Sequence, residues 1–191
     1  SFPLRPESLQ AINDMGFTQP TEIQEQALPL LLTQDAVDFV GLAQTGTGKT
    51  AAYGLPLIER VDEESPYCQG LVVCPTRELC LQVSEELTKF TRHIQGFRIA
   101  AIYGGVNMRP QVEQLRKGQH IIVATPGRLL DHIKSRNVNL EYLQTAVLDE
   151  ADKMLEMGFE DDVRSILEAG NPDADRWLFS ATMEPAIRKI A

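Results

Sequence analysis

The sequence predicts an α/β fold in which a mostly parallel central β-sheet carries helices on both faces. Short runs of β-branched and other apolar residues alternate along the chain with longer amphipathic stretches. Two adjacent parallel strands need a crossover connection, usually a helix, so this alternation favours a parallel sheet. The 191 residues suffice for one domain with a full core and are too few for two large ones. We therefore expect residues 1–191 to form one domain.

Two helices are expected before the first strand. Pro6–Met15 repeats apolar residues at helical spacing and stops at Gly16, which suits a C-terminal cap, and Thr21 opens the second helix. Several runs then have the composition of buried strands, with helical patterns in the gaps between them: Val37–Leu42, Gly70–Cys74, Phe97–Tyr103, His120–Ala124, Thr145–Leu148 and Arg176–Phe179. The clearest helical pattern is Arg77–Ile94, whose apolar residues form one stripe.

Composition limits the class of protein. The chain is 43% hydrophobic and 24% charged, as soluble globular proteins are, and no apolar run approaches the roughly 20 residues needed to span a bilayer. Cys68, Cys74 and Cys80 are odd in number and form no C-x-x-C pair, which predicts buried, reduced thiols and a cytoplasmic protein. The histidines lack the spacing to these cysteines that a metal site requires, so we expect core or solvated histidines.

The formal net charge of −9 bears on any nucleic-acid partner. Proteins that bind nucleic acids usually present a basic surface, which releases counterions from the phosphate backbone. An acidic chain must instead rely on helix N-termini, backbone amides and a few arginines. We expect this chain alone to bind a nucleic acid weakly.

The stretch 43–50, A-Q-T-G-T-G-K-T, is a glycine-rich turn between an expected strand and an expected helix, which is the context of a P-loop. Gly46 and Gly48 permit backbone angles that turn successive N–H groups toward one point. Lys49 and Thr50 can then reach the terminal phosphates and Mg²⁺. The stretch begins with alanine where the P-loop consensus has glycine, and a turn that only caps a helix is the alternative. The pattern predicts a nucleoside triphosphate as the ligand.

The stretch Val147–Asp152, V-L-D-E-A-D, is an apolar strand that ends in acidic residues. Ligands of parallel α/β sheets bind at the carboxyl ends of the strands, where the P-loop also lies. We expect Asp149 to hold Mg²⁺, mostly through water, and Glu150 to orient and deprotonate the attacking water. The alternative is a helix N-terminus that carries acids because the helix dipole favours them.

The D-E-A-D letters at 149–152, with other motifs in the same order, resemble the DEAD-box RNA helicases over essentially the whole chain. The resemblance implies a RecA-like P-loop domain. Residues 16–24, G-F-T-Q-P-T-E-I-Q, look like the family's Q motif, which implies that Gln24 pairs with adenine and that Phe17 lines the adenine pocket. The last four of these letters also fit a capping box, in which Gln24 reaches back to the Thr21 backbone.

Family members carry a further aromatic residue upstream that stacks on the adenine. Phe2 lies slightly too close to Gly16 to match it, so we expect the chain to begin just after that aromatic residue and base stacking to be incomplete. The residues that the P-loop and the Q motif imply for nucleotide binding are Phe17, Gln24, Gln44, Thr45, Gly46, Thr47, Gly48, Lys49 and Thr50.

Three further segments are similar to RNA-contacting motifs of the family: Pro75–Leu79, Gly104–Gly105 and Thr125–Arg128. Each is expected at a strand-to-helix junction, where free N–H groups and the helix dipole attract a phosphate. Thr125 followed by proline is also an ordinary N-cap. The residues implied for RNA binding, through sugar and phosphate and therefore independent of sequence, are Thr76, Arg77, Gly105, Thr125, Gly127 and Arg128.

The segment 180–182, S-A-T, looks like the family's coupling motif, in which the hydroxyls of Ser180 and Thr182 bond Asp152 and link the ATP site to RNA; a polar turn is the alternative. The family's catalytic unit also has a second RecA-like domain, which supplies arginine fingers and half of the RNA surface. No such domain follows in this chain, so we expect it to be the N-terminal domain, monomeric on its own.

The resemblance implies an ATP-dependent RNA helicase that uses ATP and Mg²⁺. Its catalytic residues would be Lys49, Asp149 and Glu150, and its metal ligands Thr50 and Asp149. This chain alone is expected to bind adenine nucleotide modestly and barely hydrolyse it, because an arginine finger contributes about 10³ or more to the rate. The alternatives are a nucleotide-gated RNA clamp that unwinds little, a P-loop GTPase, disfavoured because no N-K-x-D sequence occurs, and a DNA helicase.

Overall fold

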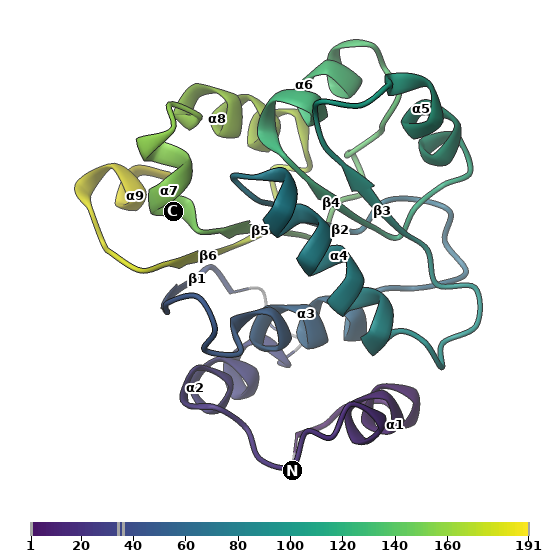
Figure 1. Cartoon of the computed structure of the whole chain (residues 1–191), viewed down its shortest axis with the longest axis vertical. Coiled ribbons are helices and arrows are strands. Elements are labelled where there is room, and N and C mark those ends of the chain that lie inside the picture. Colours follow the sequence, from purple (N-terminus) through teal and green to yellow (C-terminus); the bar gives the residue numbers. More distant parts are fainter. Residues whose placement is uncertain (1, 34, 36, 191) are drawn as a thin grey trace.

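A single sheet with parallel strands organises the computed structural model, which describes residues 2–33, 35 and 37–190. The strand order is β1-β6-β5-β2-β4-β3, and every pairing between neighbours is parallel (Figure 1). The strands are β1 (Phe39–Leu42), β2 (Gly70–Val73), β3 (Ile99–Ile102), β4 (Ile121–Ala124), β5 (Thr145–Asp149) and β6 (Asp175–Ser180). The predicted α/β fold with a parallel sheet is confirmed.

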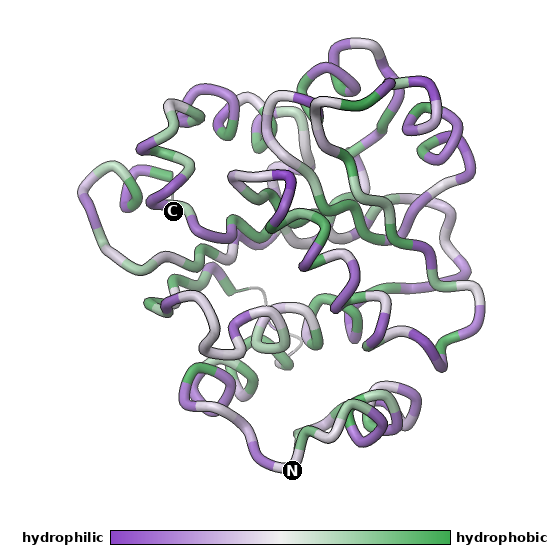
Figure 2. The backbone as a smooth tube through the Cα atoms, viewed as in Figure 1, coloured by the Kyte–Doolittle hydropathy of each residue, from purple (hydrophilic) through white to green (hydrophobic). Residues whose placement is uncertain are grey.

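Helices cover both faces of the sheet. One face packs against α1 (Pro6–Asp14), α2 (Glu22–Leu31), α3 (Lys49–Glu59) and α4 (Arg77–Phe90). The other packs against α5 (Met108–Arg116), α6 (Pro126–Lys134), α7 (Ala151–Glu156), α8 (Glu160–Ala169) and α9 (Pro185–Ile190). Because side chains alternate along a strand, Val72 enters the first core, whereas Leu71 and Val73 enter the second. Both faces are buried, so the central strands are apolar throughout (Figure 2).

The predicted ends of the first and fourth helices differ from the structure, by one residue at α1, which ends at Asp14, and by more at α4. Gly16 has a φ of +76° and follows α1, as expected of a C-terminal glycine cap. The stripe Arg77–Ile94 predicted a longer helix, but α4 ends at Phe90 and turns follow. Ile94 is nevertheless buried against the same core as α4, which explains why the apolar spacing continued past the last helical residue.

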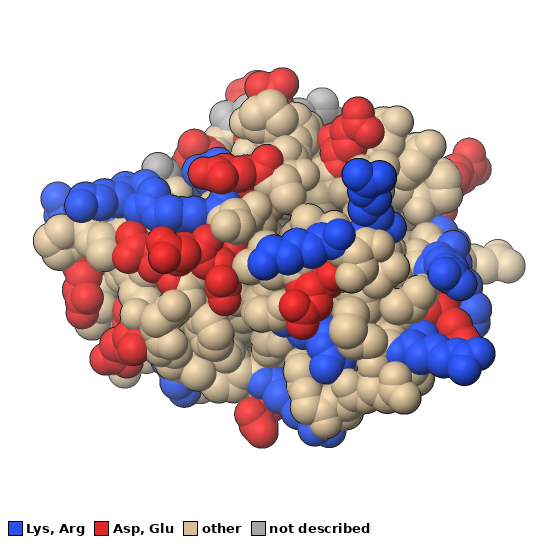
Figure 3. All heavy atoms as spheres, turned by 90° about the horizontal axis from the view of Figure 1, so that it is seen from above, with Lys and Arg blue, Asp and Glu red and all other residues tan. Residues whose placement is uncertain are grey.

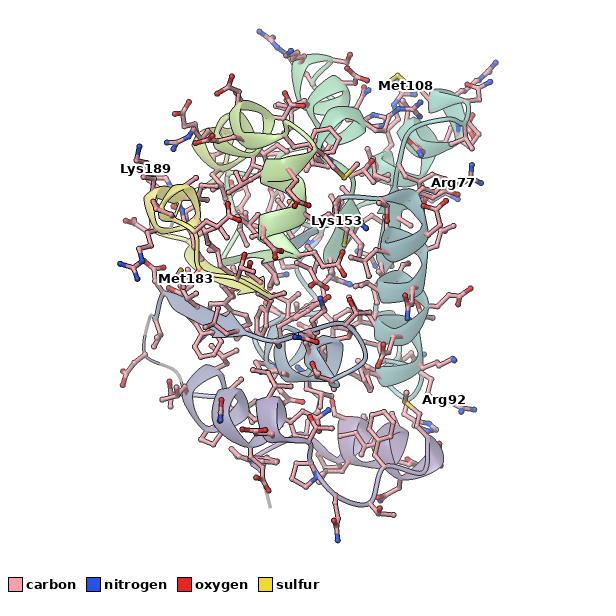
Figure 4. All side chains as sticks on the ribbon, turned by 60° about the vertical axis from the view of Figure 1, so that its left-hand side comes forward. Arg77, Arg92, Met108, Lys153, Met183 and Lys189 are labelled. Carbon is pink, nitrogen blue, oxygen red and sulfur yellow. The ribbon has the colours of Figure 1, made fainter. Side chains whose placement is uncertain are left out.

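The carboxyl edge of the sheet collects the segments that the motifs singled out. Since all strands run the same way, the residues that follow each strand emerge at one edge. Figure 4 looks onto this edge, with Lys153 on α7 between Met183, which follows β6, and Arg77, which begins α4. The fold therefore brings to one edge motifs that lie far apart in the sequence.

The charge distribution on one face of the molecule and the burial of the cysteines can be compared with the predictions from the sequence. The face shown in Figure 3 carries acidic and basic side chains interspersed, with no continuous basic surface. Cys68, Cys74 and Cys80 are buried with free thiols, as predicted, and burial raises the pKa of Cys68 and of Cys80 to about 12. Within the described residues, no helix has the length and apolar character that crossing a membrane requires.

Gly54 tests the packing of α3 against α4. A Cβ added there would lie 2.6 Å from Leu87 Cδ2. We expect Gly54→Val to lower the free energy of unfolding by about 1–3 kcal/mol, because overpacking shifts both helices. Denaturant unfolding measures this, with Gly127→Val as the control, since a Cβ at Gly127 meets nothing within 4 Å. Equal effects of the two changes would contradict the close approach of the helices.

Candidate nucleotide and nucleic-acid site

The P-loop has the backbone geometry that its glycines predict. Gly46 and Gly48 both have a φ of +83°, in the left-handed region that side chains rarely adopt. Thr47 Oγ1 donates a hydrogen bond of 2.6 Å to the Gln44 carbonyl and braces the turn. Because α3 begins at Lys49, the first N–H groups of this helix are free to bind an anion.

A buried ion pair joins the P-loop to the acidic strand end. Lys49 Nζ lies 2.9 Å from Asp149 Oδ1 and 3.6 Å from Glu150 Oε1. Asp149 is wholly buried and Lys49 is 5% exposed, so each charge needs the other. Tyr53 donates a hydrogen bond of 2.8 Å to Asp149 Oδ2, and burial together with the Asp149 charge raises the pKa of Tyr53 well above its usual value. Tyr53 therefore remains a donor to this carboxylate.

Asp149 Oδ1 is short of partners. It makes no hydrogen bond of good geometry with any described residue, and its compensation is the charge of Lys49. A buried carboxylate oxygen in this position suits a cation, because carboxylates are preferred ligands of Mg²⁺. The residues that meet here therefore fit a metal–triphosphate group.

Glu150 has a strained backbone. Its φ of 52° and ψ of 51° lie in the left-handed region, which is uncommon for a residue with a side chain. Its carboxylate accepts a hydrogen bond of 2.9 Å from Thr45 Oγ1 of the P-loop. The strained turn thus places a second acid against the loop, beside the buried Asp149.

Gln24 makes both of the contacts that the sequence left as alternatives. Its Oε1 accepts a hydrogen bond of 3.0 Å from the Thr21 N–H, as in a capping box, and its Nε2 donates one of 3.1 Å to the Gly48 carbonyl. A Cβ on Gly48 would lie 2.6 Å from Gln24 Nε2. The Q motif is therefore docked on the P-loop through one buried amide.

An apolar cavity of about 180 Å³ adjoins this amide. Its walls include Phe2, Phe17 and Gln24. Phe2 lines the cavity, and its carbonyl accepts a hydrogen bond of 2.9 Å from the Leu4 N–H. Two aromatic rings and one amide therefore surround a space at the side of the P-loop.

The implied RNA-contacting residues lie at strand-to-helix junctions, but their side chains differ in what they are free to do. Thr76 caps α4 and accepts a hydrogen bond of 3.2 Å from the Leu79 N–H. Thr125 occupies the N-cap of α6 but makes no side-chain capping bond. Thr125 thus lacks the side-chain bond of the ordinary N-cap that the sequence offered as its alternative, whereas Thr76 forms such a bond.

Arg77 and Arg128 also differ in whether their side chains already make hydrogen bonds within the protein. The exposed Arg77 guanidinium lies over the Tyr103 ring, 4.9 Å from its centroid. The guanidinium of Arg128 donates to the Val106 carbonyl at 2.8 Å and to Gln111 Oε1 at 3.1 Å. Arg128 is therefore engaged by the protein itself.

The S-A-T segment contacts Asp152 through one of its two hydroxyls. Thr182 Oγ1 donates a hydrogen bond of 3.3 Å to Asp152 Oδ2, as the resemblance implied. Ser180 Oγ is buried and has no hydrogen-bond partner among the described residues, because Ser180 is the last residue of β6 and faces the interior. The expectation that Ser180 also bonds Asp152 is not met in this arrangement.

Sequence reasoning missed Tyr53 and Gln111. Tyr53 lies one helical turn after Lys49, a spacing that would have placed it on the same face of α3, but an apolar environment predicts a core tyrosine equally well. Gln111 carried no signal, because a glutamine in an amphipathic helix is usually a solvated residue.

Comparisons with known proteins agree on one family. The family model described as DEAD/DEAH box helicase matches residues 21–190. The chain is 50% identical over 190 residues to the DEAD-box ATP-dependent RNA helicase CshA of Bacillus subtilis and 48% identical over 191 residues to the ATP-dependent RNA helicase CshA of Listeria monocytogenes. The matches cover 100% and 99% of this chain but 38% and 36% of those proteins. The chain thus spans little more than a third of these relatives.

Solved structures give the same result. A DEAD box protein from the hyperthermophile Methanococcus jannaschii matches with a TM-score of 0.94 at 43% identity, over 100% of this chain and 52% of that one. A Dbp5 variant of S. cerevisiae, in a complex that includes ADP, matches with a TM-score of 0.89 at 34% identity, over 98% and 49%. These likenesses confirm the predicted fold class.

Substitution of the two loop glycines separates backbone strain from the contact with Gln24. We expect Gly46→Ala to lower the free energy of unfolding by about 1 kcal/mol, because alanine is strained at a positive φ. Gly48→Ala carries the same strain and also displaces the Gln24 amide, so its cost should be larger by about 1 kcal/mol, the value of a typical hydrogen bond. Denaturant unfolding without nucleotide measures both, and equal costs would show that the Q motif is not docked on Gly48.

Proposed function

The chain belongs to the DEAD/DEAH box helicase family, and from this premise we propose that it is the N-terminal, nucleotide-binding RecA-like domain of an ATP-dependent RNA helicase. One observation carries the proposal: Lys49 Nζ lies 2.9 Å from a carboxylate oxygen of Asp149 and 3.6 Å from one of Glu150, beside the P-loop. Phosphoryl transfer needs charges held in fixed positions more than it needs covalent chemistry. A buried lysine between two acids at a helix N-terminus provides such positions.

In the proposed mechanism, the P-loop residues Gln44–Thr50 bind the phosphates of ATP through backbone N–H groups and Lys49. Thr50 and Asp149 would hold Mg²⁺, which supplies charge neutralisation on the phosphates when bound. Lys49 would then exchange its contact with Asp149 for one with phosphate. Glu150 would orient the attacking water and take its proton, from the position where Thr45 now donates to it.

Adenine would occupy the apolar cavity beside the Q motif. Phe2 and Phe17 line this space, and Gln24 has an amide whose acceptor and donor match the N6 amino group and N7 of adenine. Its present bonds to Thr21 and Gly48 would have to be shared or exchanged. This arrangement supports ATP over GTP.

RNA would lie along the junctions after β2, β3 and β4 and contact the protein through its backbone. Thr76, Gly105, Thr125 and Gly127 lie at or near the starts of helices, where N–H groups attract phosphate. The hydrogen bond from Thr182 to Asp152 would couple this strip to the acids of the ATP site. Since the net charge is −9, the strip alone should bind weakly.

We propose that a second RecA-like domain of the same polypeptide completes the site. Among the described residues, no arginine forms a hydrogen bond or ion pair with Lys49, Asp149 or Glu150, yet phosphoryl transfer commonly uses one. We also propose that the protein is monomeric and that it resides in a reducing compartment such as the cytoplasm. The free thiols of the cysteines support the reducing compartment.

Glu150→Gln in the full-length protein tests the catalytic assignment. We expect ATP to bind as before and turnover to fall by about 10²–10⁴, the usual contribution of a general base. Glu156→Gln, an exposed acid on α7, is the matched control and should leave turnover unchanged. RNA-stimulated ATPase rates measure both, and unchanged turnover in Glu150→Gln would remove this residue from its proposed role.

Phe2→Ala tests whether the cavity accepts the base. We expect the Kd for ADP to rise about tenfold, because a base stacked on an aromatic ring contributes about 1–3 kcal/mol. Leu30→Ala, which changes an exposed apolar residue of α2 outside the cavity, serves as the control. Calorimetric titration gives both constants, and an equal Kd for the two variants would place the adenine elsewhere.

A further inference from the structure

The loop between β3 and α5 is held by its carbonyl groups. The Tyr103 carbonyl accepts a hydrogen bond of 3.0 Å from Gln111 Nε2, and the Val106 carbonyl accepts one of 2.8 Å from Arg128. Gly105 lies between these two anchors with a φ of +83°. The conformation of this glycine segment therefore depends on two side chains from the neighbouring helices α5 and α6.

Gln111 is the centre of this arrangement. Its Oε1 accepts hydrogen bonds from Arg128 at 3.1 Å and from His132 Nε2 at 2.9 Å, while its Nε2 donates to the Tyr103 carbonyl. Gln111 is 6% exposed and His132 is wholly buried, so water does not replace these bonds easily. One buried amide thus connects the loop, Arg128 and α6.

His132 is suited to this network in its neutral form. Asn137 Nδ2 lies 3.1 Å from His132 Nδ1, which accepts its proton, so Nε2 carries the ring proton and donates to Gln111. Burial first, and then the charge of Arg128, lower the pKa of His132, whereas Asp131 opposes this shift. The imidazole therefore acts as a fixed donor.

We infer that Gln111 is a positioning residue for RNA binding, an inference that rests on the function proposed above. Arg128 belongs to a segment that resembles an RNA-contacting motif, yet its guanidinium is directed at Val106 and Gln111. Its effect on RNA is exerted through the loop that it holds. Arg77 lies over the Tyr103 ring at the start of the same loop. The segments proposed to contact RNA are therefore connected to one another, and Gln111 holds them through the Tyr103 carbonyl.

Variants of Gln111 in the full-length protein separate positioning from folding. Gln111→Glu keeps an acceptor for Arg128 and His132 but cannot donate to the Tyr103 carbonyl; Gln111→Met loses all three bonds. Gln114→Met, one turn later on α5, is the matched control, because the Gln114 side chain makes no hydrogen bond with any described residue. Fluorescence anisotropy of a labelled oligouridylate, with Mg²⁺ and a non-hydrolysable ATP analogue, gives the RNA affinity.

We expect the RNA affinity to fall about threefold to tenfold in Gln111→Glu and further in Gln111→Met, as loss of one and then three hydrogen bonds implies. The Kd for a fluorescent ADP analogue should stay within about twofold of the wild type in Gln111→Glu, since the network does not touch the ATP site. Unchanged RNA affinity in both variants would overturn the inference. So would an equal loss of RNA and nucleotide affinity accompanied by a lower Tm, because Gln111 would then only stabilise the fold.

The wild-type protein provides two further checks. The ¹⁵N chemical shifts of the His132 ring should report a neutral imidazole with its proton on Nε2, and a proton on Nδ1 would contradict the network. If the wild-type protein does not bind the oligouridylate at all, the proposed function fails, and this inference fails with it. If the wild type and both Gln111 variants bind the oligouridylate equally well, this inference is wrong and the proposed function is unaffected.

Discussion

The ion pair between Lys49 and Asp149 is the interaction on which the rest of the site depends. Removing either partner would leave a buried charge uncompensated, which is far more costly than loss of a surface ion pair. The pair fixes the start of α3 against the end of β5, and Tyr53 holds the other oxygen of the same carboxylate. The P-loop and the acidic turn therefore form one unit. In the proposed complex, Lys49 would bind phosphate and Asp149 would bind the metal.

The strip proposed for RNA is built in a different way. Its polar groups are mostly backbone N–H groups at helix starts, and its side chains largely hold one another in place. Such an arrangement would let a protein of net charge −9 contact a nucleic-acid backbone through N–H groups instead of a basic surface. In this proposal, the backbone conformation around Gly105, held at the Tyr103 and Val106 carbonyls, contributes more to RNA binding than positive side chains do.

Much of this could be predicted from the sequence, and the reasons are physical. Strands buried on both faces are apolar throughout, so their positions were readable, and Gly46 and Gly48 have the left-handed angles that only glycine adopts freely. What could not be read from the sequence is where a side chain points after packing. The inward direction of Ser180, the engagement of Arg128 by Gln111, and the reach of Phe2 into the cavity are set by neighbours distant in the sequence.

The most direct test is a crystal structure of the full-length protein with Mg²⁺ and a non-hydrolysable ATP analogue. We predict that Lys49 Nζ leaves Asp149 for the terminal phosphates and that the adenine lies between Phe2 and Phe17, next to Gln24. A nucleotide bound at another edge of the sheet, or bound here with the pair between Lys49 and Asp149 unchanged, would contradict it.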